Sequence, residues 1–302
     1  MMNRKILLRR LKEAVTSTSL PELPRWTPPL IVLPPGITPG LRNICRVIEA
    51  RAKRVVLTTI TTPTFADVAE GEELPDVTQE IRNIVIEPKE YGTKQFVSDQ
   101  VIEDWGEQQL KDIERSLIMG GIRKLDEVII NALASDENIT VIYAGGKSAE
   151  ADLTDEDKFT WEFLIELRML MGARGYDLSS GEWALLMHPK QQADLLKTLD
   201  KGCVRLATDG FGKIGDNWIE FPKLFRIRLI TADVPTGSTS SGLTTYHAFL
   251  LKSVYSIVLA IPRNLRIQIQ RDALKRGFYF IASMRAGAAV IDPKSVLRIV
   301  TT

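Results

Sequence analysis

The chain has 302 residues, of which 44% are hydrophobic and 25% are charged, so it is long enough to bury a sizeable core as one large or two modest domains. Its 39 Lys and Arg residues nearly balance its 38 Asp and Glu residues, and the formal net charge of +1 gives no whole-chain basic excess that would indicate a nucleic-acid or membrane partner. The two cysteines, Cys45 and Cys203, lack CxxC spacing, which argues against a disulfide framework, a zinc site and a thioredoxin-type motif.

The N-terminal segment is basic and then rich in proline. Residues 3–15 predict a short amphipathic helix whose apolar positions are interrupted by Arg9, Arg10 and Lys12, so it lacks the continuous apolar core of a signal peptide. No run approaches the ~20 apolar residues of a membrane helix, and we expect a soluble intracellular protein. Seven prolines lie between residues 21 and 39. Because each removes a backbone N–H donor, they predict an extended arm rather than a helix or a central strand.

Two β-branched stretches, 54–61 and 81–87, predict the strands of a long hairpin. The segment between them, FADVAEGEELPDVTQE, has almost no large apolar side chain. A two-stranded excursion of this composition has too little apolar surface to be stable alone, so we expect a neighbouring subunit to support it.

A helical period runs from Asp99 to Ala134 and predicts one helix of about 35 residues, roughly 50 Å long. Gly120 and Gly121 are its weak point, where we expect a bend. The helix lacks the charge-flanked seam that a coiled coil sustains over several heptads. We therefore expect a spine that crosses a flat domain.

The next part of the chain alternates helix and strand. Thr154 and the acidic residues 155–157 predict a capped helix start, with Gly172 and Gly175 at the end of the helix. The strand predicted next covers 182–187, and a helix from Pro189 follows it, through Leu199. The buried face of the first helix is expected to hold Phe159, Phe163, Leu164, Leu167 and Met171.

Beyond residue 224 one strand-like segment follows another. Leu265, Ile267 and Ile269 alternate with polar residues, as in a strand with one buried face. Together with the preceding helices this pattern indicates the α+β class. The segments are LFRIRLI, YHAFLLK, SIVLA, LRIQIQR, FYFIASMR and VLRIV.

Sequence motifs of enzymes are scarce. Residues 210–215 match GxGxxG, but no helix follows, so a flexible loop is favoured over a dinucleotide site. His188 is expected to mark a strand end rather than a catalytic base, and residues 237–242 a hairpin tip rather than a phosphate loop. Residues 155–157 could bind a cation, but helix capping is favoured. We therefore expect no enzyme activity, no catalytic residue, no cofactor and no metal site.

Charge is strongly segregated along the chain. Residues 1–54 hold eleven Lys or Arg and three Glu, residues 66–81 hold six acids and no base, and residues 263–302 hold eight Lys or Arg and two Asp. This segregation, in segments that cannot fold alone, favours complementary contacts between subunits. We therefore predict that an acidic group contacts a basic surface on an adjacent subunit. The acidic group is Glu70, Glu72, Glu73 and Asp76, and the basic surface includes Arg266 and Arg271.

The order of these elements is a proline-rich arm, an acidic excursion, a long helix, a mixed subdomain and a strand-rich tail. It resembles the order in major capsid proteins of the Hong Kong 97 fold, found in tailed phages and related archaeal viruses. Encapsulin shell proteins share this fold. The phrases that carry the resemblance are EGEELP at 70–75, KQFVS at 94–98 with IED at 102–104, WALLMHP at 183–189, and RAG at 285–287 with VIDP at 290–293.

The resemblance implies a division of the chain and a function. The division is an N-terminal arm at 1–53, an E-loop with the first peripheral-domain strands at 54–97, a spine helix at 98–136, a mixed α/β axial domain at 137–262, and peripheral-domain return strands at 263–302. The function implied is self-assembly through pentamers and hexamers into an icosahedral virion shell around double-stranded DNA.

Several partners and alternatives accompany this function. The arm is expected to face the interior and to contact DNA non-specifically. The resemblance also implies a portal protein, optional decoration proteins, and assembly in the host cytoplasm without a membrane. The arm is too short for a fused scaffold, so a separate scaffold, or none, is implied. An encapsulin-like compartment is the first alternative, and a nucleotide-dependent enzyme using residues 210–215 is the second. The residues expected to contact DNA are Arg4, Lys5, Arg9, Arg10 and Lys12.

Overall fold

The computed structural model describes residues 40–50, 52–60, 67, 81–105, 107–176, 182–200, 219–220 and 227–302. These residues belong to a single unit, Gly36–Thr302. The predicted helix at 3–15, the proline-rich arm, the acidic residues from Glu70 to Asp76 and the GxGxxG loop lie outside the described residues.

A four-stranded sheet is built around a long antiparallel hairpin. Its strand order is β1-β11-β12-β4. Strand β11 contains two register shifts between Ala260 and Arg266, so one long strand covers two segments that the sequence pattern separates. The strands are β1 (Arg46–Ile48), β4 (Lys89–Ser98), β11 (Ile257–Asp272) and β12 (Gly277–Val290).

A seven-stranded sheet holds most of the remaining strands. Its order is β5-β13-β10-β6-β8-β7, with β9 paired to β10. The hairpin tip predicted at 237–242 overlaps the turn between β9 and β10, although Gly237 and Ser238 still belong to β9. The strands are β5 (Thr140–Tyr143), β6 (Trp183–Met187), β7 (Ile219–Glu220), β8 (Ile227–Thr231), β9 (Thr236–Ser238), β10 (Thr244–Lys252) and β13 (Val296–Thr301).

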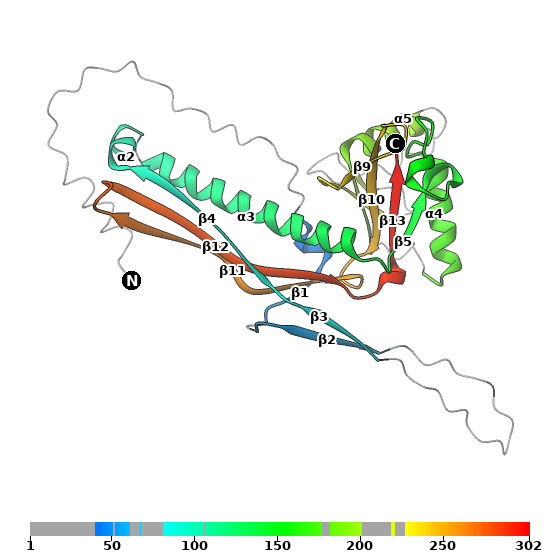
Figure 1. Ribbon diagram of the computed structural model, residues 1–302, viewed down its shortest axis with the longest axis horizontal. Coiled ribbons are helices and arrows are strands. Elements are labelled where there is room, and N and C mark those ends of the chain that lie inside the picture. The colour runs from blue at the N-terminus through cyan, green and yellow to red at the C-terminus, as the bar shows by residue number, and fades with distance from the viewer. Residues whose placement is uncertain are drawn as a thin grey trace. The chain divides into compact units, whose positions relative to one another are not determined.

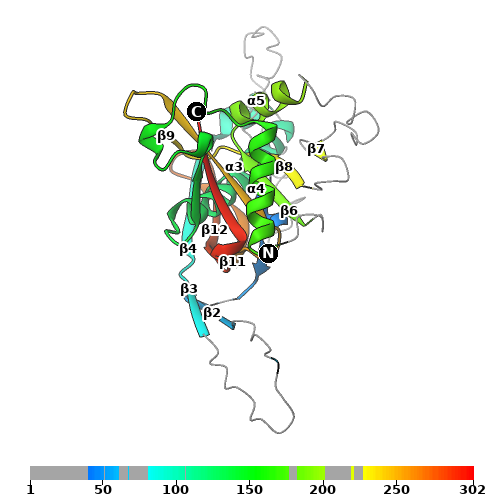
Figure 2. The ribbon, with the colours of Figure 1, turned by 90° about the vertical axis from the view of Figure 1, so that its right-hand side faces the viewer.

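Both faces of this second sheet are covered, which explains why every side chain of β6 is buried. On one face lies α4 (Trp161–Ala173), whose Leu164 and Leu167 pack with Leu185 and Leu297. Figure 2 shows α4 next to β13. Helix α5 (Pro189–Asp200) follows β6, and short 3-10 turns connect the other elements. These turns are η1 (Leu41–Ile44), η2 (Ala144–Gly146), η3 (Glu150–Asp152) and η5 (Pro293–Ser295).

The long helix α3 (Glu107–Ser135) connects the two sheets. It runs along β12 of the four-stranded sheet, as Figure 1 shows. Near its C-terminal end, Ile129 and Leu133 are fully buried and join a cluster with Phe249 of the seven-stranded sheet and Leu259 of β11. Because one apolar cluster includes side chains from α3 and from both sheets, they share a continuous core.

The helix predicted from Asp99 to Ala134 is present, but as two elements. Helix α2 (Asp99–Trp105) precedes α3, and Gly106 lies outside the described residues. Helix α3 continues through Gly120 and Gly121, where a bend was predicted. A Cβ on Gly121 would lie 2.8 Å from Leu265 Cδ2. Gly121 therefore allows α3 to approach β11 closely.

The predicted hairpin forms a separate two-stranded sheet of β2 (Val55–Ile60) and β3 (Ile81–Ile86). Val55 and Ile86 face each other and pack against Val258 of β11. On the opposite face Val56 and Val85 form another cross-strand pair, and these side chains are 53% and 48% exposed. The base of the hairpin therefore belongs to the core on one face only.

The predicted helix start at Thr154 is wrong. Thr160 caps α4, with its hydroxyl accepting from the N–H of Phe163 at 3.2 Å. The Asp157 carboxylate instead accepts from both the N–H and the hydroxyl of Thr154. This turn also holds the last residue, since Thr302 donates to Asp157 O and Thr154 O. The acidic run is therefore used for a turn rather than for capping.

The predicted boundary at residue 263 does not separate the two sheets. Strand β11 crosses it, and β13 pairs with β10 and β5 in the seven-stranded sheet. The last strand therefore returns to the sheet that contains β6, whereas the division implied by the resemblance places it among the return strands of 263–302.

Candidate functional site

The structure places the two predicted basic residues, Arg266 and Arg271, on opposite faces of β11. They lie an odd number of positions apart in an unbroken register with β12, and alternate side chains of a strand point to opposite faces. A single partner segment lying on one face of the sheet cannot contact both. The predicted acidic partners and the predicted DNA-contacting residues lie outside the described residues.

Arg271 already has partners within the chain. Its Nη2 lies 3.8 Å from Asp99 Oδ2 at the start of α2, and its guanidinium lies 5.7 Å from the centroid of the Phe278 ring. Arg266 is exposed and lies on the other face, together with Gln268 and Gln270. Of the two residues, only Arg266 therefore lies on the face directed away from α3.

A group of cations and aromatic rings occupies this same face near the β11–β12 turn. We name Lys94, Phe96, Lys275 and Tyr279 the cation-aromatic patch. The rings of Phe96 and Tyr279 lie 5.0 Å apart, and Lys94 Nζ lies 5.4 Å from the Tyr279 centroid. Lys275 Nζ donates to the Tyr279 hydroxyl at 2.9 Å, and this hydrogen bond raises the pKa of Lys275. An open hollow of about 350 Å³ adjoins the patch.

The turn beside the patch exposes a leucine side chain. Leu274 is 98% exposed. Asp272 Oδ1 accepts from the N–H groups of Leu274 and Lys275, and Arg276 adopts a positive φ of 50° that completes the turn. A hydrogen-bonded turn that exposes an apolar side chain beside aromatic rings and cations is suited to contact another polypeptide.

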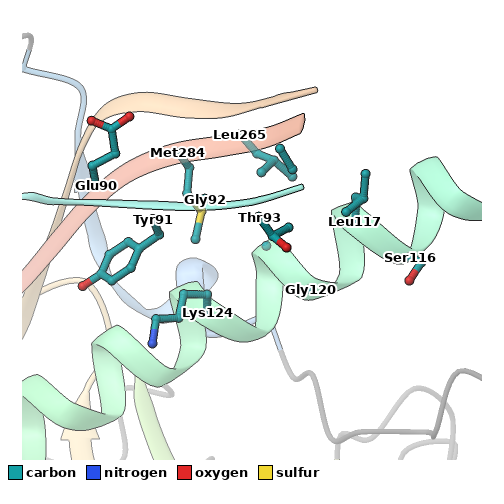
Figure 3. A pocket seen from close by; sticks show the side chains of 12 residues that line it. Glu90, Tyr91, Gly92, Thr93, Ser116, Leu117, Gly120, Lys124, Leu265 and Met284 are labelled. Carbon is teal, nitrogen blue, oxygen red and sulfur yellow. The ribbon is translucent and has the colours of Figure 1, made fainter. Parts of the chain in front are cut away.

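A groove of about 550 Å³ lies on the other face of the sheet, between the sheet and α3. Figure 3 shows Tyr91 and Met284 on the sheet side and Lys124 and Leu117 on the helix side. Lys124 Nζ lies 5.2 Å from the Tyr91 centroid and 2.7 Å from Glu127 Oε1. Lys124, a charged residue of the groove, thus has structural partners on both the sheet and the helix.

The start of the described chain is anchored on α3 by a buried carboxylate. Asp126 accepts from the N–H of Gly40 at 3.2 Å and from the N–H of Leu41 at 2.8 Å. Burial raises the pKa of Asp126, and the two backbone hydrogen bonds oppose that rise. Burial and the nearby Asp126 charge also raise the pKa of the Cys45 thiol, so this cysteine is unsuited to act as a thiolate nucleophile.

His188 directly follows β6, at the strand end where it was predicted. Its Nδ1 accepts from the N–H of Lys190, and Gln191 Oε1 accepts from the N–H of His188 at 3.0 Å. This reciprocal pair caps the first turn of α5. Burial lowers the pKa of His188. In the described part of the chain, no cluster of three or more His, Cys, Asp and Glu residues could hold a metal ion.

The sequence reasoning missed the cation-aromatic patch. Its signal was present, because Lys94 and Phe96 alternate within one strand segment and Tyr279 lies in another. What the sequence lacks is the register: Phe96 pairs with Tyr279 only because β4 and β12 are neighbours in antiparallel order.

None of the helices in the described ranges is long and apolar enough to span a membrane.

Comparison by sequence and comparison by structure give different results. No protein-family model and no curated protein matches the sequence. Among solved structures, the capsid of cyanophage Pam1 superposes with a TM-score of 0.65 at 10% identity, over 85% of this chain and 88% of that chain. The capsid of the native GTA particle gives a TM-score of 0.60 at 13% identity, over 100% of both chains.

A compartment shell also matches. The holo-SrpI encapsulin complex from Synechococcus elongatus PCC 7942 gives a TM-score of 0.60 at 14% identity, over 99% of this chain and 95% of that chain. The predicted α+β class and the resemblance drawn from local phrases are both confirmed. The likeness along most of each chain shows that this chain has the Hong Kong 97 fold of phage major capsid proteins and encapsulin shells.

Proposed function

We propose that this chain is a major capsid protein, which self-assembles into an icosahedral shell that encloses packaged double-stranded DNA. The observation that carries the proposal is the fold it shares, over 85–100% of its own length, with the capsid proteins of cyanophage Pam1 and the GTA particle. Exposed apolar side chains at Val56, Val85 and Leu274 support it, because they require a neighbouring surface to leave water.

The proposed division of the chain is the one that the resemblance implies, with one change at the last strand. Residues 1–53 form the arm, 54–97 the E-loop with its adjoining strands, and 98–136 the spine helix. Residues 137–262 form the axial domain, to which β13 also contributes through its pairing with β10. The remaining strands of 263–302 form the return of the peripheral domain.

The acidic excursion is proposed to bind the peripheral domain of an adjacent subunit. Its four proposed contact residues, Glu70, Glu72, Glu73 and Asp76, occur in a segment without any basic residue. The face of the four-stranded sheet directed away from α3 offers Arg266, Lys94 and Lys275 within one surface. This face is the better partner than Arg271, which lies on the opposite face beside Asp99.

The arm is proposed to lie inside the shell. Asp126 accepts hydrogen bonds from the backbone at Gly40 and Leu41, so the five proposed DNA-contacting residues of the arm precede an attachment point on α3. Arg4, Lys5, Arg9, Arg10 and Lys12 would contact DNA phosphates without sequence preference. Pentamers and hexamers of the chain, separate scaffold and portal proteins, and assembly in the host cytoplasm complete the proposal. The protein would act without a cofactor and without catalysing a reaction.

An encapsulin-like compartment is the second candidate, because the encapsulin match covers 99% of the chain. The test is electron microscopy of purified particles, followed by nuclease treatment and identification of the cargo. Particles that hold nuclease-protected DNA support the capsid, whereas particles that hold a co-purified enzyme support the compartment. A chain that stays monomeric under all assembly conditions refutes both. Saturable nucleotide binding that Gly212→Asp abolishes would instead support the enzyme alternative.

A further inference from the structure

Besides its apolar contacts, the C-terminal end of α3 accepts a hydrogen bond from an arginine of the seven-stranded sheet. Arg298 of β13 donates from Nη1 to the carbonyl oxygen of Ala134 at 3.3 Å. Ala134 belongs to the last turn of α3, where backbone carbonyls have no partner within the helix and a positive charge is favourable. Arg298 therefore acts as a C-terminal cap of the helix that both sheets share.

The position of Arg298 depends on a buried histidine. Arg298 Nε donates to His247 Nδ1 at 3.1 Å, so Nδ1 must carry a lone pair and His247 is neutral, with its proton on Nε2. His247 is 3% exposed. It lies on the same face of β10 as Phe249 and Leu251, which pack with the end of α3.

The other side of the imidazole faces an acid. Glu150 of η3 places Oε1 3.6 Å from His247 Nε2, and the same oxygen accepts a hydrogen bond from the Thr245 hydroxyl. A Cβ on Gly237 would clash with this oxygen, so the glycine leaves room for the Glu150 carboxylate. In the described part of the chain, the charged groups that act on His247 are Arg298 from β13 and Glu150 from η3.

We propose that Glu150, His247 and Arg298 form an acid-sensitive joint that attaches the end of α3 to the seven-stranded sheet. A proton taken from solvent by Nδ1 converts this acceptor into a donor that faces the Arg298 donor. The hydrogen bond at 3.1 Å is then lost, and two positive charges lie side by side. The imidazolium is drawn toward Glu150, and Arg298 moves away and releases the carbonyl of Ala134.

The charges around His247 place the transition in the acidic range. Burial lowers the pKa of His247, the neighbouring Arg298 charge lowers it further, and Glu150 opposes both effects. The joint is therefore closed at neutral pH and opens on acidification. In a shell, opening would free the spine helix to change its angle to the axial domain. That consequence rests on the proposed function, whereas the joint itself is a property of the single chain.

Hydrogen exchange of the full-length protein tests the joint in whatever assembly state the protein adopts. Protection of the amides at 131–138, corrected for intrinsic exchange, is followed in steps from about pH 7.5 down to about pH 4. We expect protection to fall roughly tenfold or more within this range, because a hydrogen bond to a charged group is lost. Amides in β6 should show no comparable change.

The chain has only two histidines, which provides a matched control. His247→Asn keeps an acceptor near the position of Nδ1 but cannot be protonated, so its protection should not depend on pH. His188→Asn should behave like the wild type. Arg298→Gln should have low protection throughout this pH range.

A milder variant covers the case in which His247→Asn does not fold. Glu150→Gln removes the charge that favours the imidazolium, so protection should be lost at a lower pH than in the wild type. Equal protection of the wild-type chain throughout this pH range would overturn the proposal. So would an acid response that His188→Asn abolishes, or one that Glu150→Gln leaves unchanged. Each of these outcomes leaves shell formation, and hence the proposed function, as a separate question.

Discussion

The exposed valine pair on the β2–β3 hairpin should contribute to assembly and not to the stability of the single chain. Val56 and Val85 face each other across the strands and are 53% and 48% exposed. Burying a whole valine side chain contributes roughly 1.5–3 kcal/mol. About half of each side chain is still in water, so a neighbouring subunit that covers both would gain roughly 2 kcal/mol.

The perturbation is the double substitution Val56→Thr and Val85→Thr. Threonine keeps the β-branched shape that favours a strand, so the hairpin should be retained. The free energy of unfolding of the unassembled chain should change by less than about 0.5 kcal/mol, because both positions are exposed. The concentration needed for assembly should rise roughly 30-fold, which corresponds to a loss of about 2 kcal/mol per subunit.

Urea unfolding of the unassembled chain and light scattering of assembly against concentration are the two measurements. Val55→Thr is the matched control, because Val55 is buried and packs against Val258. This control should lower the free energy of unfolding by roughly 1–3 kcal/mol, since a hydroxyl is placed in an apolar cluster. Assembly of the double variant at the wild-type concentration would refute the reasoning, because no neighbour would then cover the pair.

Four further outcomes are expected. Neutralising the four proposed contact acids of the excursion should leave the melting temperature of the chain unchanged but weaken the shells. High salt should have the same effect on the wild type, since the screening length falls to ~3 Å at 1 M. Equal particle yield of variant and wild type at low salt would contradict this. Replacing the five basic residues of the arm with Gln should lower DNA retention without preventing assembly, unless intact particles hold DNA equally well. The pKa of His247 is lowered in the folded chain, so its contribution to stability is complete above about pH 6.5 and is lost as the pH falls. On acidification to about pH 5, the free energy of unfolding measured in urea should therefore fall less for His247→Asn than for the wild type. Gly120→Ala should raise the free energy of unfolding by about 0.5–1 kcal/mol, since nothing lies within 4 Å of the Cβ that the substitution adds. Gly121→Ala should raise it less, because Leu265 must move to make room. Equal increases would show that α3 does not approach β11 this closely.

Local patterns in the sequence are sufficient to predict most of the secondary structure. The alternation in 265–271, the β-branched stretches that became β2 and β3, and the apolar run of β6 each reflect a period set by the backbone. The order of these elements, together with short phrases such as WALLMHP, was also enough to indicate the fold that the structural comparisons confirm. Periodicity and order are properties of neighbouring residues, and the sequence records them directly.

Caps and turns were less predictable, because several residues compete for the same backbone groups. Thr154 and Thr160 both stand before acidic or apolar residues, and only Thr160 caps α4. Thr154 is used instead in the turn that holds Thr302, a contact between residues far apart in sequence. A local pattern cannot reveal which of two suitable residues will form hydrogen bonds with a distant segment.

The candidate site was decided by the tertiary structure. The sequence predicted a basic surface from the charge of 263–302, but Arg266 and Arg271 lie on opposite faces, and Lys94 joins the surface from a strand far away in the chain. The joint at His247 likewise requires β10, β13, η3 and the end of α3 to meet. Strand register and sheet order are set by the burial of apolar side chains from all elements at once, so contacts between distant side chains follow only from the complete packed fold.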